Sequence, residues 1–183
     1  MRVIAGRCAG ARLTAPRGRA TRPLTDRVKE ALFAALGTRL DGASVLDLYA
    51  GSGAAGIEAL SRGARRAVFV ERDRSAGAAI RGNLERTALA AAAEVVVGDV
   101  ERFIAQDDGA RYDVILVDPP YDVTLAPGAL ESIARHVAAR GVVVVKHFWR
   151  TAPPAIEALR VVRTRRFGET ALTFLQAAGE EVR

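Results

Sequence analysis

Residues 46–56 read LDLYAGSGAAG, and this segment decides the fold class of the chain. The apolar residues at its start are typical of a buried strand, and the pattern that follows predicts a helix over 54–63. Between the two, Gly51, Gly53 and Gly56 match G-x-G-x-x-G, the pattern of a tight loop that approaches a ligand closely. The segment therefore predicts an α/β fold with a ligand site beyond the end of its first strand.

Strand and helix patterns alternate along the rest of the chain. An amphipathic helix over 26–36 comes first, with Thr25 as its N-cap and Gly37 at its end. Strands are then expected over 44–50, 66–71, 94–99, 112–118 and 141–148, with helices over 54–63, 74–90, 100–107 and 127–139 between them. Two further expected strands, separated only by a short turn, cover 159–167 and 170–176. The pattern predicts a mostly parallel, seven-stranded α/β sheet that ends in an antiparallel hairpin.

Basic residues are concentrated in the first part of the chain. The 183 residues carry a net charge of +6, but residues 1–40 alone hold nine arginines or lysines against two acids, and the remainder holds 18 basic and 19 acidic residues. We expect residues 1–24 to form a small basic β extension that binds a nucleic-acid backbone, and residues 25–183 to form the α/β domain. The candidate backbone contacts are Arg7, Arg12, Arg17, Arg19, Arg22 and Arg27. A solvated arm of an arginine-rich protein is the alternative interpretation.

The composition argues against several other classes. No apolar run reaches the roughly 18 residues typical of a membrane helix, and no cleavable signal sequence is evident, so we expect a cytoplasmic protein with no membrane partner. A single cysteine, Cys8, rules out an internal disulfide. One cysteine and two histidines also make a metal site unexpected. Because the sequence shows no pattern of an exposed heptad repeat or apolar patch, we expect a monomer.

Acidic residues lie at the ends of the predicted parallel strands, where such sheets bind ligands. Glu71 follows Gly51 by 20 residues, and a carboxylate there accepts hydrogen bonds from the hydroxyls of an adenosine ribose. Asp47, inside the first strand, favours a cationic ligand such as S-adenosylmethionine over the pyrophosphate of a nicotinamide-dependent oxidoreductase. Asp99, after the third strand, suits an adenine amino group. For Asp47 and Asp99 the alternatives are structural, as a cap of the glycine turn and as the N-cap of the next helix.

The segment VDPPYD, residues 117–122, ends the fourth strand with an acid, two prolines and an aromatic ring. Considered alone, it is more typical of a rigid surface turn. At the ligand edge of the sheet, Asp118 and the carbonyl of Pro119 are suited to accept both N–H groups of a planar exocyclic amine, which frees its lone pair to attack a methyl group. Tyr121 offers a face on which a base stacks. The segment therefore predicts an N-methyltransferase in which positioning supplies much of the acceleration.

Six segments of the chain carry a specific resemblance. They are RVIAGRCAGARL (2–13), TRPLTDRVKEALF (21–33), VLDLYAGSGAAGIEALSRGA (45–64), VFVERD (68–73), VDPPYD (117–122) and FGETALTFL (167–175). Over essentially its full length the chain resembles the bacterial RsmD family of 16S rRNA (guanine-N2)-methyltransferases. The resemblance implies a class I, Rossmann-like, S-adenosylmethionine-dependent methyltransferase with an N-terminal β extension that helps to hold RNA. The implied substrate is one guanine of 16S rRNA, guanine 966 in the family, in the small ribosomal subunit or a late precursor of it.

The resemblance also assigns roles to individual positions. The implied cofactor-binding residues are Asp47, Tyr49, Gly51, Ser52, Gly53, Glu71, Arg72, Asp99 and Val100, and the implied catalytic residues are Asp118, Pro119, Pro120 and Tyr121. The chain departs from the family pattern at Leu24 and Lys29, and at Lys146 and His147, where an acid followed by histidine is common. Two alternatives remain open: methylation of another planar amine, in DNA adenine or protein glutamine, and a non-catalytic, RNA-binding role in ribosome assembly.

Overall fold

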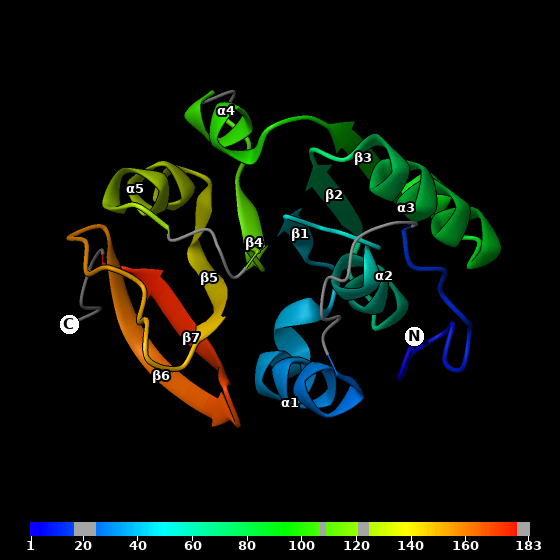
Figure 1. Ribbon diagram of the computed structural model, residues 1–183, viewed down its shortest axis with the longest axis horizontal. Helices are drawn as coiled ribbons and strands as arrows, with labels where there is room; N and C mark the ends of the chain where they lie inside the picture. The colour runs from blue at the N-terminus through cyan, green and yellow to red at the C-terminus, as the bar shows by residue number, and fades with distance from the viewer. Residues whose placement is uncertain (17–24, 107–108, 121–124, 179–183) are drawn as a thin grey trace.

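Seven strands form one sheet at the centre of the molecule. The computed structural model describes residues 1–16, 25–106, 109–120 and 125–178, and within them the strand order is β3-β2-β1-β4-β5-β7-β6 (Figure 1). The strands are β1 (Ser44–Leu48), β2 (Arg66–Glu71), β3 (Ala93–Val97), β4 (Tyr112–Val117), β5 (Val137–Phe148), β6 (Leu159–Phe167) and β7 (Thr170–Ala177). β1 to β5 pair in parallel, whereas β7 is antiparallel to both β5 and β6. The predicted sheet and its C-terminal hairpin are confirmed.

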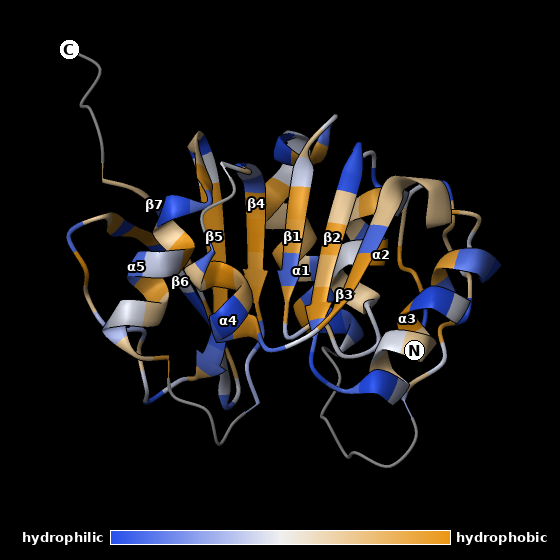
Figure 2. Ribbon diagram, turned by 90° about the horizontal axis from the view of Figure 1, so that it is seen from above, coloured by the Kyte–Doolittle hydropathy of each residue, from blue (hydrophilic) through white to orange (hydrophobic). Residues whose placement is uncertain are grey.

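Helices cover both faces of this sheet. They are α1 (Asp26–Leu36), α2 (Ala54–Ser61), α3 (Arg74–Arg86), α4 (Val100–Ala105) and α5 (Pro127–Arg135), with short 3-10 helices η1 (Gly37–Leu40) and η2 (Ala90–Ala92). Figure 1 shows α1 and α2 on one face and α4 and α5 on the other. In β1, Val45 packs in the core with α1, α2 and α3, whereas Leu46 and Leu48 pack in the core with α4 and α5. Strands buried on both faces read as continuous apolar runs, which Figure 2 shows along β4 and β5.

The ends of α1 agree with the prediction, whereas the end of α3 does not. Thr25 caps α1 by accepting a hydrogen bond from the Val28 N–H at 3.4 Å. Gly37 ends the helix with a φ of 52°, which glycine adopts without strain. α3 stops at Arg86 rather than near residue 90. Ala88 has a φ of 55°, which no right-handed helix continues, and this turn directs the chain into β3.

The boundary between α5 and β5 also differs from the prediction. The sequence predicted a helix to residue 139 and a strand from 141, but β5 already begins at Val137. Val137 pairs with Tyr112 of β4, and a register shift after this pair lets the same strand continue as far as Phe148. The Tyr112 N–H also donates to the His136 carbonyl at 2.8 Å. Pairing with β4 therefore places residues 137–139 in β5 and not in the predicted helix.

Residues 1–16, called the arm below, fold back on themselves beside α2 and α3 (Figure 1, blue). The arm contains one isolated antiparallel bridge, Arg2 with Arg12, and no strand, which is less regular structure than the predicted β extension. Val3 and Leu13 are buried in the same core as α1 and α2. The described part of the extension is therefore packed against the α/β domain and does not extend away from it.

Candidate active site

Three acidic side chains lie where β1, β2 and β4 end. Asp47 is in register with Phe69 of β2 and with Leu116 of β4. Glu71 and Asp118 each come two residues after those partners, and residues two apart on a strand share a face. All three acids therefore face the side of the sheet that carries α1 and α2. The negative charges of Asp118 and Glu71 contribute to raising the pKa of Asp47, as expected from this arrangement.

Asp47 is buried beneath the first turn of α2. Its Oδ2 accepts a hydrogen bond from the Gly56 N–H at 2.9 Å. Burial is the main reason that the pKa of Asp47 is raised from 3.8 to about 8, and the bond from Gly56 opposes that rise. The structural alternative considered for Asp47, a cap of the glycine turn, is thus realised in the structure. Its contact with the cationic part of a cofactor stays a prediction.

Two glycines of the loop serve different purposes. Gly53 is the N-cap of α2 and has a φ of 75°, which favours glycine. A Cβ on Gly56 would lie 2.3 Å from Cε1 of Phe69 and 3.1 Å from Oδ2 of Asp47. Gly56 therefore allows α2 to pack closely on β2, so the third glycine of the motif serves helix–strand packing.

Glu71 holds the glycine loop at the end of β2. Its Oε2 accepts from the Gly51 N–H at 2.9 Å, and its Oε1 accepts from the Asp73 N–H at 2.9 Å. Because an ionised carboxylate has about four acceptor sites, two remain for the hydroxyls of a ribose. The acceptor sites of Glu71 therefore fit the ribose hydroxyls of S-adenosylmethionine, and Glu71 and the loop from Gly51 to Gly53 are the residues that would hold its adenosine part.

Four other predicted cofactor-binding residues lie together near the end of β1, towards the face of the sheet that carries α4 and α5. They are Tyr49, Arg72, Asp99 and Val100. Tyr49 has a φ of 59°, an unusual conformation for a residue other than glycine and one that occurs often at functional sites. Burial raises the pKa of the Tyr49 hydroxyl, the charges of Glu101 and Asp99 raise it further, and Arg72 lowers it. Asp99 accepts from the Arg102 N–H at 3.0 Å, so it is also the N-cap of α4.

Asp118 and Lys146 form an ion pair at the carboxyl ends of β4 and β5. The distance from Lys146 Nζ to Asp118 Oδ1 is 2.6 Å. Burial raises the pKa of Asp118, and the charge and hydrogen bond of Lys146 lower it. The Lys146 side chain is 9% exposed and that of Asp118 is 30% exposed, so the carboxylate faces solvent more than its partner does. Sequence reasoning assigned Lys146 no role, because its position opposite Asp118 depends on strand register.

The remaining residues of the DPPY segment are only partly described. The Asp118 N–H donates to the Leu48 carbonyl at 3.4 Å, which ties the start of the segment to β1. Pro119 and Pro120 are half-buried. Tyr121 lies outside the described residues. The structure therefore brings Asp118, Pro119 and Pro120 to the same sheet edge as the glycine loop, and the stacking role of Tyr121 stays a prediction.

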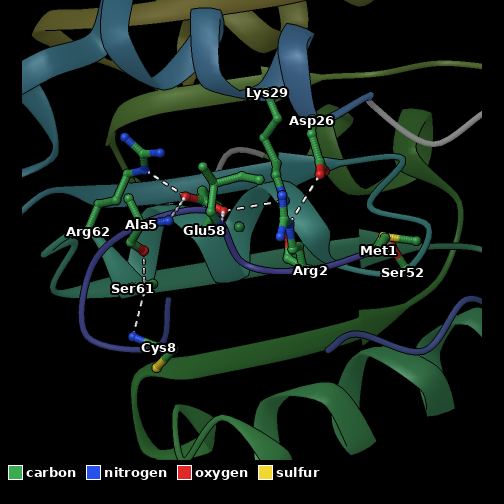
Figure 3. Close-up of polar contacts among 12 residues, drawn as sticks. Met1, Arg2, Ala5, Cys8, Asp26, Lys29, Ser52, Glu58, Ser61 and Arg62 are labelled. Atoms are coloured by element: carbon green, nitrogen blue, oxygen red, sulfur yellow. Dashed lines mark hydrogen bonds and ion pairs between the residues drawn. The ribbon is translucent and has the colours of Figure 1, made fainter. Parts of the chain in front are cut away.

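Glu58 anchors the arm to α2 (Figure 3). Its carboxylate accepts from the N–H groups of Ile4 at 2.7 Å and Ala5 at 2.9 Å. It also pairs with Arg62 at 2.7 Å and with Lys29 at 3.3 Å. Glu58 and Lys29 are fully buried, and Lys29 also donates to the Arg2 carbonyl. A buried carboxylate is tolerated only when it is paired and hydrogen-bonded, as it is here.

Asn83 of α3 connects the arm to the glycine loop. Its Oδ1 accepts from the Thr14 N–H at 2.8 Å, and its Nδ2 donates to the Thr14 carbonyl at 2.9 Å and to the Ser52 carbonyl at 3.0 Å. The Ser52 hydroxyl donates to Sδ of Met1 at 3.1 Å, as Figure 3 shows. The predicted contact of Ser52 with the cofactor stays a prediction, and the structure shows that Ser52 contacts the arm.

The basic residues among the first 40 positions are less available for RNA than their number suggested. Lys29 is buried against Glu58, and Arg2 pairs with Asp26 at 3.3 Å. Of the predicted contacts, Arg7, Arg12 and Arg27 are exposed, whereas Arg17, Arg19 and Arg22 lie outside the described residues. The Arg7 N–H donates to the carbonyl of Ser61, the last residue of α2, so Arg7 lies at the end of that helix farthest from the glycine loop.

Neither a metal site nor a membrane-spanning helix is found in the part of the chain that the structure describes. No group of three or more histidine, cysteine, aspartate or glutamate side chains is arranged there to hold a metal ion. No helix among the same residues has the length and apolar character needed to cross a membrane.

Comparisons with known proteins agree with the fold. A family model described as Conserved hypothetical protein 95 matches residues 1–176. YlbH of Bacillus subtilis (strain 168) is 36% identical over 98% of this chain and 100% of its own length. Ribosomal RNA small subunit methyltransferase D of Escherichia coli (strain K12) is 41% identical over 66% of this chain and 60% of its own length. The solved structure of yhhF from Escherichia coli is 32% identical and superposes with a TM-score of 0.87 over 98% of this chain and 99% of that one. The chain therefore belongs to the RsmD family, and its sheet is the class I methyltransferase sheet that the sequence predicted.

Proposed function

We propose that this chain transfers a methyl group from S-adenosylmethionine to the exocyclic N2 of one guanine of 16S rRNA, within the small ribosomal subunit or a late precursor of it. The observation that carries the proposal is the position of Asp118. This partly exposed carboxylate lies at the end of β4, at the same sheet edge as the glycine loop and Glu71. A relative named ribosomal RNA small subunit methyltransferase D supports the substrate.

The proposed chemistry follows from the weakness of the nucleophile. The lone pair of the guanine amino group is delocalised into the ring, so it attacks carbon poorly. S-adenosylmethionine would supply a methyl group activated by its sulfonium: the S–CH3 bond breaks as the N–CH3 bond forms, and S-adenosylhomocysteine is the leaving group. An ionised Asp118 accepts one N–H of the amine and the Pro119 carbonyl accepts the other, which localises the lone pair and stabilises the positive charge that develops on nitrogen. The proton leaves after that charge has formed, so no strong base is needed beforehand.

Lys146 fits this role for Asp118. Burial favours the neutral form of a carboxyl group, which accepts hydrogen bonds less well than the ionised form. The ammonium of Lys146, 2.6 Å from Oδ1, opposes that effect and holds the carboxylate in one orientation. Lys146 therefore acts through Asp118 as a positioning residue.

The test offers purified protein and methyl-labelled S-adenosylmethionine to two substrates. These are small ribosomal subunits from a strain that lacks the enzyme, and deproteinised 16S rRNA from the same strain. Digestion and mass spectrometry then identify the methylated nucleoside. We expect N2-methylguanosine at a single site, and no labelling by an Asp118→Ala variant that still binds S-adenosylmethionine.

Other outcomes separate the remaining functions. Labelling of DNA or of protein in place of rRNA would identify a different planar amine as the target. Cofactor binding without methylation of any of these substrates would contradict the proposed reaction. An Asp118→Ala variant that still restores ribosome assembly in the deletion strain would support a non-catalytic assembly factor.

A further inference from the structure

A second concentration of positive charge lies on the C-terminal hairpin and the turn before it. Residues 149–168 carry five arginines against a single acid, Glu157. The five, called the hairpin arginines below, are Arg150, Arg160, Arg163, Arg165 and Arg166. Four of them are exposed, and Arg165 is half-buried. The net charge of residues 41–183 does not reveal this cluster, because acidic residues in other elements balance its charge.

The hairpin arginines begin next to the candidate active site. Lys146 of β5, which pairs with Asp118, is in register with Leu172 of β7, and Leu172 is in register with Arg165 of β6. Residues directly opposite one another in neighbouring strands project from the same face. Adjacent strands lie about 4.8 Å apart, so the Cα of Arg165 is about 10 Å from that of Lys146. Arg163, two residues earlier, continues the same face of β6 towards solvent.

Trp149 holds two of these arginines beyond the end of β5, with Arg166 projecting from the face of β6 opposite to that of Arg165. It follows the last residue of β5, and its N–H donates to the Glu169 carbonyl at 2.9 Å. The Arg166 guanidinium lies 3.6 Å from the centre of a Trp149 ring, and the Arg150 guanidinium lies 4.8 Å from it. A stacked guanidinium loses less freedom when it binds a ligand, and its N–H groups in the ring plane suit the oxygens of a phosphate.

The need to protect an open sheet edge accounts for only part of this pattern. β6 is the last strand of the sheet, and charges on an edge strand oppose pairing with another chain. That need is met by charges of either sign. It explains neither why all four charged residues of β6 are arginines nor why two guanidiniums stack on Trp149 beyond the end of β5. A single-sign cluster at the rim of a site that binds RNA fits a phosphate backbone better.

We infer that Arg163 and Arg165 on one face of the edge strand β6, together with Arg166 on its other face and Arg150 beside Trp149, form a second surface around that edge that binds the rRNA backbone. The arm lies beside α2 and α3 at one end of the sheet, and β6 forms the other end, as Figure 1 shows. The candidate site thus lies between two contacts with the same RNA, which fixes the strand on both sides of the target base. The identity of that RNA rests on the proposed function.

The test compares two double variants with the same change of charge. Arg163→Gln/Arg165→Gln alters the hairpin surface. Arg135→Gln/Arg140→Gln alters two exposed arginines near the start of β5, at the amino ends of the parallel strands and therefore away from the candidate site. Binding to deproteinised 16S rRNA is measured over a series of salt concentrations. For the hairpin variant we expect affinity about 10-fold weaker at low salt and a log–log salt slope smaller by about 1.4, since each lost contact removes about 0.7. The control variant should match the parent in both quantities.

Further measurements keep the outcomes separable. Unchanged affinity for S-adenosylmethionine and unchanged thermal unfolding show that the hairpin variant is folded, and Arg163→Gln alone serves as a milder variant. Equal salt slopes for the hairpin variant and the parent would overturn the inference, as would equal losses in the hairpin and control variants. Lost binding to small subunits with unchanged binding to deproteinised rRNA would overturn it in favour of an acidic protein partner. A parent that binds rRNA through these arginines but does not methylate it would support the surface and contradict the proposed reaction.

Discussion

Lys146 donates a hydrogen bond of 2.6 Å to Asp118, across two parallel strands whose register places Val117 opposite Val145. The pair is the most direct electrostatic contact of the proposed catalytic carboxylate. Burial raises the pKa of Asp118 and Lys146 lowers it, so the ammonium favours the ionised form of the carboxyl group. Only the ionised form offers all its oxygen lone pairs to the amine of a target base.

Replacing Lys146 with methionine should shift the dependence of activity on pH. Without the ammonium the pKa of Asp118 rises further, so the carboxyl group stays protonated up to a higher pH. We expect kcat/KM for rRNA methylation to fall by about 10-fold at neutral pH and to recover as the pH rises, because one pKa unit corresponds to a factor of ten in ionisation. Measuring kcat/KM from acidic to alkaline pH tests this. Lys146→Arg keeps the charge and should stay close to the parent, and an equal loss at every pH in Lys146→Met would contradict the role assigned here.

Lys146 illustrates what the sequence did not reveal. The fold was predictable because each strand, turn and helix carries its own local pattern, from the glycine loop to the hairpin. Lys146 and Asp118 are 28 residues apart, and their contact depends on how β4 and β5 align. No local pattern encodes that alignment. The same applies to residues 137–140, which continue β5 only because Val137 pairs with Tyr112.

The polar residues that hold the arm could be recognised only in part from the sequence. Asn83 lies on the buried face of α3 with Ile80 and Leu84, and a polar residue on an apolar stripe signals a specific hydrogen-bond partner. Its partners, Thr14 and Ser52, come from distant parts of the chain and were not predictable. Charge counting predicted a basic surface and included Lys29 in the count, although its ammonium is buried against Glu58.

Asp47 should make the folded protein less stable as the pH rises. Its pKa is raised from 3.8 to about 8 in the folded protein, so between these values the unfolded chain has lost a proton that the folded chain retains. The free energy of unfolding therefore falls with pH through this window, by up to about 1.4 kcal/mol per pH unit. Asp47→Asn keeps a side-chain oxygen for the Gly56 N–H and removes the titration. Urea unfolding without cofactor should show the variant gaining stability over the parent across the window, and a difference independent of pH would contradict the raised pKa.

Glu58→Ala should loosen the arm and destabilise the whole domain. The substitution leaves the buried ammonium of Lys29 without its counter-charge and the N–H groups of Ile4 and Ala5 without an acceptor. We expect the free energy of unfolding to fall by about 3–5 kcal/mol and amide exchange in the arm to accelerate. Lys29→Met/Glu58→Gln removes both charges and keeps an oxygen for one of the two N–H groups, so it should recover part of the loss. A cost below about 1 kcal/mol for Glu58→Ala would show that the cluster is not what holds the arm.

Asn83→Ala should uncouple the arm from the cofactor loop. In the parent, one buried amide binds both Thr14 of the arm and the carbonyl of Ser52, so ordering of the loop by S-adenosylmethionine should also slow amide exchange near Thr14. The variant leaves these backbone groups unpaired, and we expect the free energy of unfolding to fall by about 2–3 kcal/mol and the cofactor Kd to rise several-fold. The effect of the cofactor on exchange near Thr14 should disappear. Arg86→Ala is the matched control, because Arg86 is exposed and donates to the same amide oxygen at 2.7 Å without taking part in the bridge. If the cofactor still protects Thr14 in Asn83→Ala, the coupling runs through another contact, of which Met1 against Ser52 is the nearest candidate.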